Sequence, residues 1–377
     1  MKLLPEIALT YDDVLLVPKY STVRSRKKLT TKTRLTSKLS LQIPIVSANM
    51  DTVTESEMAI TMARAGGIGI IHRFMTIEEQ VKQVLRVKKS ESFVVKNPIT
   101  LKASDTVGDV NRIVEETYTG GIVILDNDER VVGIITTRDL LFVKDENRLI
   151  GELMTHDVVT APAETSLEEA QKILHKHRVE KLPLVDADGK LAGLITVKDI
   201  MKMEKYPLAS KDELGRLAVG AAIGVKSNEL TRVERLLDAG VDVIVIDIAH
   251  GDSKLEVGMV EKIRKHFPDA QLIGGNVATA EGTQRLIDAG VDAVKVGVGP
   301  GSICITRIVA GAGVPQFSAV NACAEVARPQ GIPIIADGGI RTSGDIVKAL
   351  GAGASTVMLG SMLAGTDESP GIFVTRK

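Results

Sequence analysis

The feature that most constrains the fold is an apolar run of strand length that recurs eight times. Helical patterns with one apolar side follow most of these runs. Strands that are apolar throughout and alternate with helices favour a parallel sheet covered on both faces. The eight runs are residues 43–50, 68–73, 217–224, 241–248, 271–277, 293–299, 332–339 and 355–361.

Eight strand–helix units predict an α/β fold, the (β/α)8 or TIM barrel. Without the segment that interrupts them, the units occupy roughly 260 residues, which is close to the usual size of such a barrel. A doubly wound sheet is the competing architecture, but the sequence carries no Rossmann fingerprint. Ahead of the first run, residues 21–38 are basic and polar, and we expect them to cross the surface.

A tandem repeat interrupts the strand–helix pattern. Residues 121–140 align without a gap on residues 181–200, an offset of 60 residues. Each copy is typical of a hairpin flanked by helices, and two copies can bury their apolar faces against each other. We therefore predict an independent insert within the barrel. The expected parts are a first barrel part at 1–93, an insert at 94–203 with copies at 94–150 and 154–203, and a second barrel part at 204–377.

Composition narrows the classes of partner. Charged residues make up 25% of the chain and the formal net charge is −1, so nothing favours nucleic acid or an anionic membrane surface. No apolar run reaches the roughly 18 residues of a membrane span. Cys304 and Cys323 are the only cysteines, too few for a disulfide framework or a zinc site. We expect a cytoplasmic protein.

Polar residues and glycines gather at the ends of the predicted strands. The C-terminal ends of the strands form the catalytic face of a TIM barrel. Glycine turns after the last two strands also fit a phosphate site with backbone N–H donors. Each position alone is a weak signal because glycine and aspartate commonly end strands, but together they predict one mouth. They are Ser47, Asp247, Asn276, the loop 297–304, Asp337, Gly338, Gly339, Gly360 and Ser361.

The loop 297–304 carries the main candidate for chemistry. Three glycines at 297, 299 and 301 open into Ser302 and Cys304. Glycines let backbone groups approach a phosphate or cation closely. Cys304 is a nucleophile if its thiolate is stabilised, and the alternative is a small buried hydrophobic residue.

The inserted repeat resembles a pair of cystathionine-beta-synthase-type (CBS, or Bateman) domains. The resemblance rests on Gly-x-x-Thr-x-x-Asp in both copies, with Thr136 and Asp139 recurring as Thr196 and Asp199. It implies that these four residues meet the phosphates and ribose of an adenine or guanine nucleotide. Their other interpretation is turn and cap chemistry at the start of the following helix.

The whole chain resembles the inosine-5′-monophosphate dehydrogenase family, a TIM barrel with a CBS pair inserted after its second unit. The resemblance is carried by Thr-Tyr-Asp-Asp-Val-Leu-Leu-Val-Pro at 10–18, Gly-Pro-Gly-Ser-Ile-Cys-Ile-Thr-Arg at 299–307 and Ala-Asp-Gly-Gly-Ile-Arg at 336–341. It implies NAD-dependent oxidation of inosine monophosphate to xanthosine monophosphate, in guanine nucleotide biosynthesis, by a homotetramer.

The resemblance also implies roles for individual residues. Cys304, with Thr306 beside it, would form a covalent thioimidate with the purine. The nucleotide would be held by Ser47, Ser302, Asp337, Gly338, Gly339, Gly360 and Ser361. NAD would face Asp247, Asn276, Gly297, Val298 and Gly299. Potassium would be bound by the carbonyls of Gly299, Gly301 and Cys304.

The family continues beyond the eighth strand with a Gly-Met-Gly substrate loop and a flap that activates the hydrolytic water. We expect this chain, which is unlike the family at 372–377, to be shortened there; a natural truncation, a frameshift and a fragment stay open. Two other functions are alternatives. One is guanosine-monophosphate reductase, a sister barrel that usually lacks the insert, so that residues 94–203 argue against it. The other is a catalytically impaired, CBS-bearing subunit that senses nucleotides.

Overall fold

The structure is a computed structural model that describes residues 7–25, 27, 29–90, 94–95, 98–117, 119–226 and 228–371. Two predictions fall outside the described parts: nucleotide binding by the side chain of Asp199, and the departure from the family at residues 372–377. The chain divides into two compact units, one of Met1–Ser90 with Leu208–Lys377 and one of Glu91–Pro207. The predicted insert, 94–203, falls inside the second unit.

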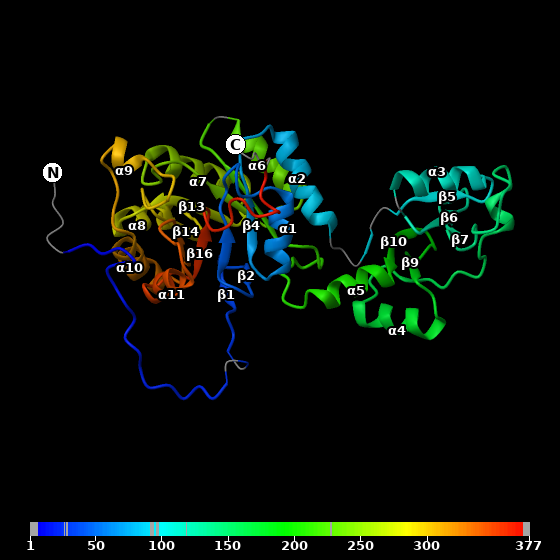
Figure 1. The fold of residues 1–377 in the computed structure, drawn as a ribbon. Helices are drawn as coiled ribbons and strands as arrows, with labels where there is room; N and C mark the ends of the chain where they lie inside the picture. The colour runs from blue at the N-terminus through cyan, green and yellow to red at the C-terminus, as the bar shows by residue number, and fades with distance from the viewer. Residues whose placement is uncertain are drawn as a thin grey trace, which may run out of the picture. The chain divides into compact units, whose positions relative to one another are not determined.

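Eight parallel strands close into a barrel in the first unit (Figure 1), which confirms the predicted TIM barrel. Pairing of β4 with β11 closes the ring and places Gly69 opposite Val219. Around the barrel the strands are β11 (Val219–Ile223), β12 (Val243–Ile246), β13 (Leu272–Val277), β14 (Ala293–Val296), β15 (Ile334–Asp337), β16 (Thr356–Leu359), β3 (Ile45–Ser47) and β4 (Ile68–Ile71).

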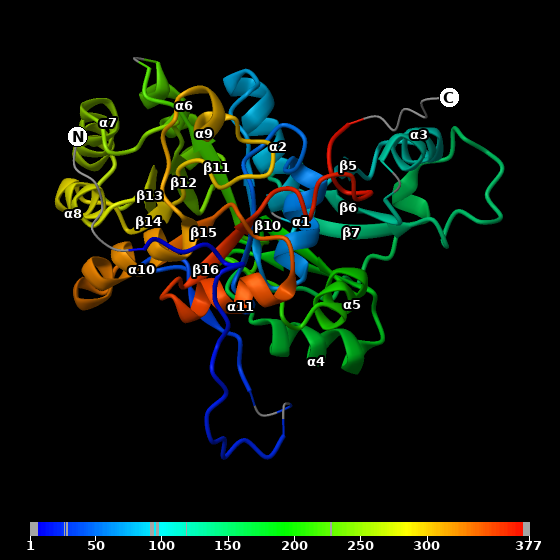
Figure 2. The same cartoon turned by 60° about the vertical axis from the view of Figure 1, so that its left-hand side comes forward.

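Helices pack around the outside of the barrel strands (Figure 2). Several begin at a hydroxyl residue whose side chain accepts a backbone N–H: Ser253 from Glu256, Thr279 from Gly282 and Thr342 from Asp345. The helices of this unit are α1 (Ser56–Arg64), α2 (Ile77–Ser90), α6 (Glu229–Asp238), α7 (Lys254–His266), α8 (Ala280–Ala289), α9 (Thr306–Val309), α10 (Gln316–Ala327), η3 (Arg328–Gln330) and α11 (Ser343–Gly351).

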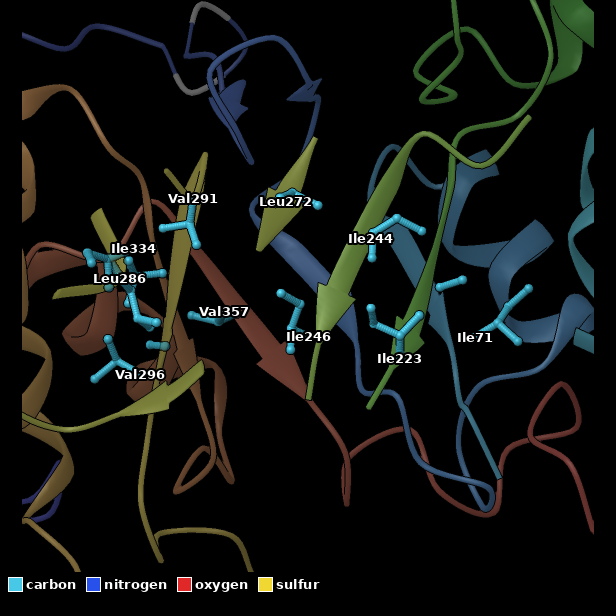
Figure 3. Close-up of a cluster of buried hydrophobic side chains, with 14 of the residues drawn as sticks. Ile71, Ile223, Ile244, Ile246, Leu272, Leu286, Val291, Val296, Ile334 and Val357 are labelled. Atoms are coloured by element: carbon cyan, nitrogen blue, oxygen red, sulfur yellow. The ribbon is translucent and has the colours of Figure 1, made fainter. Parts of the chain in front are cut away.

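Two apolar layers form because successive residues of a strand point to opposite faces. Ile244 and Ile246 of β12 pack outward against the helices (Figure 3), whereas Val243 and Val245 pack inside the barrel. Because of this alternation, one continuous apolar strand supplies side chains to both the outer and the inner layer. It also decides which residue at the end of each strand points into the barrel.

A short hairpin of β1 (Thr33–Arg34) and β2 (Ser40–Leu41) precedes the first barrel strand. Leu35 and Leu41 are fully buried in the inner apolar cluster of the barrel. The prediction that residues 21–38 simply cross the surface is therefore wrong at Leu35. The basic composition of the segment hid a single apolar side chain that fills the barrel interior.

The second unit contains two three-stranded sheets with the same pattern of pairing. In each, the middle strand pairs in parallel with the first strand and antiparallel with the third. The first copy contains β5 (Thr100–Lys102), α3 (Val107–Thr117), β6 (Gly121–Leu125), β7 (Val131–Thr136) and η2 (Ile150–Glu152). The second contains β8 (Ala161–Pro162), α4 (Leu167–His177), β9 (Lys181–Val185), β10 (Leu191–Thr196) and α5 (Val197–Lys205).

Four elements recur at the same 60-residue offset that the sequence shows: β5 with β8, α3 with α4, β6 with β9 and β7 with β10. Each copy also has its own apolar core, with Ile122 and Ile135 in one and Leu182 and Ile195 in the other. In the described parts of both units, no helix has the length and apolar stretch needed to cross a bilayer.

Candidate active site

A cavity of about 530 Å³ opens at the C-terminal ends of the barrel strands. It brings together six residues that the family resemblance assigns to nucleotide binding, from three separate loops: Ser302, Asp337, Gly338, Gly339, Gly360 and Ser361. Convergence of strand ends at one edge explains why residues more than 50 positions apart meet here.

The turn after β15 brings its backbone close to the loop after β14. Gly338 and Gly339 have φ values of +91° and +76°, a region that favours glycine. A Cβ at Gly338 would lie 2.9 Å from Pro300 Cγ and 3.1 Å from the Gly301 nitrogen. This glycine therefore permits both the turn and the close approach of the two loops that line the cavity.

The cysteine loop lies beside this cavity. Gly301, Ser302 and Ile303 line it, whereas Cys304 itself does not. The Cys304 thiol is partly exposed and donates a hydrogen bond to Thr306 Oγ1 at 3.2 Å. The two residues named from sequence as the catalytic pair are therefore in contact, and the thiol remains accessible.

A buried lysine links the strand ends below the mouth. Lys295 of β14 donates from Nζ to Asp247 Oδ1 at 3.1 Å and to Asp337 Oδ2 at 3.0 Å, and it also hydrogen bonds with Asn276 Oδ1. Asn276 in turn donates from Nδ2 to the Gly297 carbonyl at 2.8 Å and to Asp337 Oδ2 at 2.9 Å. The residues predicted for cofactor and for nucleotide thus belong to one network.

Opposing effects set the pKa of Asp247. Burial alone would raise it, but the Lys295 ammonium and hydrogen bonds from Lys295 and Asn49 outweigh burial and hold the pKa below its ordinary value. The carboxylate is therefore ionised at neutral pH and available as a hydrogen-bond acceptor. The same balance raises the pKa of Lys295: burial opposes its charge, and Asp337 and Asp247 favour it more strongly.

Residues 8–377 match the family model of the IMP dehydrogenase / GMP reductase domain. The chain belongs to this family. Among curated relatives it is 57% identical over 368 residues to inosine-5′-monophosphate dehydrogenase of Nitrosopumilus maritimus, covering 98% of this chain and 77% of the relative. It is 56% identical over 366 residues to the Aquifex aeolicus enzyme of the same name, covering 96% and 74%.

Solved structures of the family's other branch are also similar. A single-residue variant of GMP reductase of Trypanosoma brucei, in complex with guanosine 5′-monophosphate, has a TM-score of 0.91 and 48% identity, covering 98% of this chain and 79% of that chain. The same organism's GMP reductase with guanosine 5′-triphosphate has a TM-score of 0.89 and 49% identity, covering 97% and 88%. Residues 94–203 therefore do not count against a reductase, contrary to the prediction, because the reductase structures match nearly the whole chain, insert included.

Some residues at this family site were not found from sequence. Tyr11 lines the cavity, is 2% exposed, and has a hydroxyl without a partner among the described residues. Gln316 donates from Nε2 to the carbonyls of Val296 and Asp337 at 2.8 and 3.1 Å. Lys295 carried a usable signal, since a charged residue in a run of buried apolar residues requires partners.

Other predicted residues do not line the cavity. Ser47 is fully buried and its hydroxyl accepts a hydrogen bond from Thr54 Oγ1 at 2.8 Å, while Ala48 next to it lines the cavity.

Among the described residues there is no group of three or more His, Cys, Asp or Glu side chains that could hold a metal ion.

The second unit has its own cavity of about 710 Å³, lined by residues from both copies of the repeat. Thr196 lines it, as do Lys181 and Lys198. Thr136 does not; its Oγ1 and N–H both donate to Asp139 Oδ2, at 2.7 and 2.8 Å. In the first copy, this is the turn chemistry that the sequence offered as the alternative.

Proposed function

We propose that the chain oxidises inosine 5′-monophosphate to xanthosine 5′-monophosphate with NAD as the hydride acceptor. The observation that carries the proposal is the mouth of the barrel, where an accessible thiol adjoins a cavity lined by glycine turns and Asp337. The identity of 57% and 56% to two dehydrogenases, against 48% and 49% in two structures of one reductase, supports the oxidative direction.

The chemistry begins at Cys304. Its sulfur adds to C2 of the hypoxanthine ring, and C2 then loses its hydride; NAD, when bound, would supply the hydride acceptor. This leaves a thioimidate between C2 and the sulfur. Water then adds to C2 and the carbon–sulfur bond breaks, which releases xanthosine monophosphate and the free thiol. Thr306, 3.2 Å from the sulfur, is placed to exchange a proton with groups at this centre.

The cavity supplies groups for the rest of the nucleotide. The carboxylate of Asp337 would accept hydrogen bonds from ribose hydroxyls. Backbone N–H groups of the turns at Gly338–Gly339 and Gly360–Ser361, with the Ser302 hydroxyl, would bind the phosphate. The buried Tyr11 hydroxyl, which has no partner among the described residues, is a further donor in the same cavity.

The cofactor would contact Asp247, Asn276 and residues 297–299, next to the nucleotide cavity. Asp247 and Asn276 join Lys295 there, and residues 297–299 continue from the end of β14. Gly297 has φ +150°, and a Cβ on it would lie 2.0 Å from the Asp337 carbonyl oxygen. The missing side chain thus lets the backbone at Gly297 run close to β15.

A monovalent cation would be held by the carbonyls of Gly299, Gly301 and Cys304. The Gly301 carbonyl accepts the Cys304 N–H at 3.0 Å and keeps a second lone pair for a cation. Gly299 has φ +82°, which turns the chain within this short loop. Neutral oxygen ligands suit a hard ion such as potassium, which would fix the loop that carries the nucleophile.

We further propose that the second unit is a CBS pair that binds adenine or guanine nucleotides in its 710 Å³ cavity. Lys181 and Lys198 provide positive charge, and Thr196 provides a hydroxyl. Burial lowers the pKa of Lys181 despite the opposing influence of Glu180. The repeated sheets and the similarity to a reductase solved with guanosine 5′-triphosphate support this proposal.

A homotetramer is the proposed assembly, on the strength of the family. Large apolar side chains of the N-terminal segment support an assembly, because Leu15 and Val17 are 85% and 81% exposed. Size-exclusion chromatography with light scattering would test it: a monomer at micromolar concentration would contradict the tetramer.

Two assays test the reaction. Inosine monophosphate with NAD should give NADH and xanthosine monophosphate, and Cys304→Ala should give neither. The reductase is the second candidate, since its structures match the chain with a TM-score of 0.91. Oxidation of NADPH by guanosine monophosphate, without NADH formation from inosine monophosphate, would favour the reductase. Nucleotide binding without either reaction would favour the sensing subunit.

A further inference from the structure

Lys295 is a buried charge in the wall of the barrel. Alternation along β14 points Val294 and Val296 outward to the helices, while Ala293 and Lys295 point into the barrel. The Lys295 side chain is 2% exposed. Burying an ammonium is strongly unfavourable unless it is paired and hydrogen bonded, so the partners of Lys295 explain its presence.

The partners come from three other strands. Asp247 follows β12, Asn276 belongs to β13 and Asp337 ends β15, and each presents an oxygen to the same Nζ. One cation therefore lies between two carboxylates that would otherwise repel each other in a poorly solvated site. The Asp247 and Asp337 side chains are still 24% and 22% exposed.

The two carboxylate oxygens of Asp337 differ in their hydrogen-bond partners. Its Oδ2 accepts from both Lys295 and Asn276, at 3.0 and 2.9 Å. Among the described residues, no hydrogen bond to its Oδ1 is found, and Asp337 lines the cavity. The inner oxygen is thus fixed by protein donors, which leaves the outer oxygen for a ligand.

We propose that Lys295 is a positioning residue that fixes the Asp337 carboxylate so that its outer oxygen accepts hydrogen bonds from the ribose hydroxyls of the substrate nucleotide. The same ammonium fixes Asp247 on the cofactor side. This inference rests on the proposed function, since it requires a ribonucleotide in the cavity. Without the ammonium, the two carboxylates turn apart or share a proton, and the outer oxygen of Asp337 loses its position.

A second buried lysine provides a matched control. Lys88, at the end of α2, has a side chain 2% exposed and bridges Asp212 and Asp242 at 2.9 and 2.7 Å. Asp242 precedes β12, so this bridge lies at the N-terminal end of the barrel, away from the cavity. Lys88→Met removes the same kind of bridge and tests what loss of a buried ion pair does by itself.

The experiment compares two ligands on four proteins. Calorimetry gives the affinities of inosine monophosphate and of 2′-deoxyinosine monophosphate for the native chain, Lys295→Met, Lys295→Arg and Lys88→Met. Losing a hydrogen bond to a charged acceptor weakens binding about 10- to 100-fold, so the native chain should prefer the ribonucleotide by that factor. The preference should fall to about two-fold in Lys295→Met, persist in Lys88→Met and largely return in Lys295→Arg.

The outcomes separate the two proposals. An unchanged ribose preference in folded Lys295→Met would overturn the positioning role, whatever its effect on stability. If native protein binds neither nucleotide, the proposed function fails, and this inference fails with it. Circular dichroism reports folding. If Lys295→Met is unfolded, Lys295→Gln, whose amide is a donor without the charge, replaces it with the same expected loss of preference.

Discussion

Glu256 makes the stability of the barrel depend on pH in a direction unusual for a carboxylate. It lies in the first turn of α7, is fully buried, and accepts the Gly275 N–H at Oε1 with a distance of 2.6 Å. Its Oε2 has no partner among the described residues. Burial raises the pKa of Glu256 to about 8, and the Gly275 hydrogen bond and Lys295 only partly oppose this.

The perturbation is Glu256→Gln, which keeps the shape and removes the titration. The folded pKa of about 8 exceeds the ordinary 4.5, so the contribution of the carboxyl to stability is complete below about pH 4.5 and is lost as pH rises towards 8. Each pH unit in that window costs about 1.4 kcal/mol. Across the whole window, the native chain should lose about 5 kcal/mol that the variant retains.

Urea denaturation followed by far-ultraviolet circular dichroism measures this, because the chain has no tryptophan to serve as a fluorescent probe. The unfolding free energy of Glu256→Gln minus that of the native chain should rise by about 1.4 kcal/mol per unit between about pH 5 and 8 and then level off. Taking the difference cancels titrating groups that do not interact with Glu256. A difference that stays constant across this window would refute the reasoning.

Glu169→Gln is a control with the same substitution and the opposite sign. Glu169 belongs to the capping box of α4, where hydrogen bonds from the Ser166 side chain and backbone lower its pKa. The contribution of the Glu169 carboxylate to the free energy of unfolding is present above the pKa of the unfolded state. It is lost as pH falls through the pKa of the folded state. The variant should therefore be less stable than the native chain near neutral pH, and the two should converge in acid.

Three further predictions concern the thiols, a glycine and the insert. Iodoacetamide should alkylate Cys304 and spare Cys323, because Cys323 is fully buried and burial raises the pKa of its thiol to about 11; peptide mass spectrometry checks this, and equal labelling would contradict it. Gly297→Ala should lose about 2–4 kcal/mol of stability because its Cβ would meet a carbonyl oxygen at 2.0 Å, whereas Gly258→Ala in helix α7, with open space around it, should gain up to about 1 kcal/mol. Deleting 91–207 should preserve the barrel's circular-dichroism signature and remove nucleotide responses that arise in the second unit; a collapse of that signature would show that the barrel depends on the insert.

The barrel and the repeat were predictable because each follows from patterns of residues that are close together in the sequence. An apolar run followed by a helical pattern specifies one strand–helix unit, and eight such units leave few arrangements other than a closed barrel. The 60-residue offset that aligns the two copies reappears in their helices and strands. The glycine-rich loop also marked Cys304 and Thr306 as neighbours, since they lie two positions apart.

Contacts between distant strands were decided only by the tertiary structure. Lys295 meets partners 48, 19 and 42 positions away because alternation turns its side chain inward just where neighbouring strands end. Leu35 fills the barrel interior although the residues around it are polar and basic. Thr136, whose Oγ1 donates to Asp139, does not line the cavity that its repeat partner Thr196 lines. A local pattern fixes which way a strand's residues alternate, but barrel closure decides which side chains from other strands meet them.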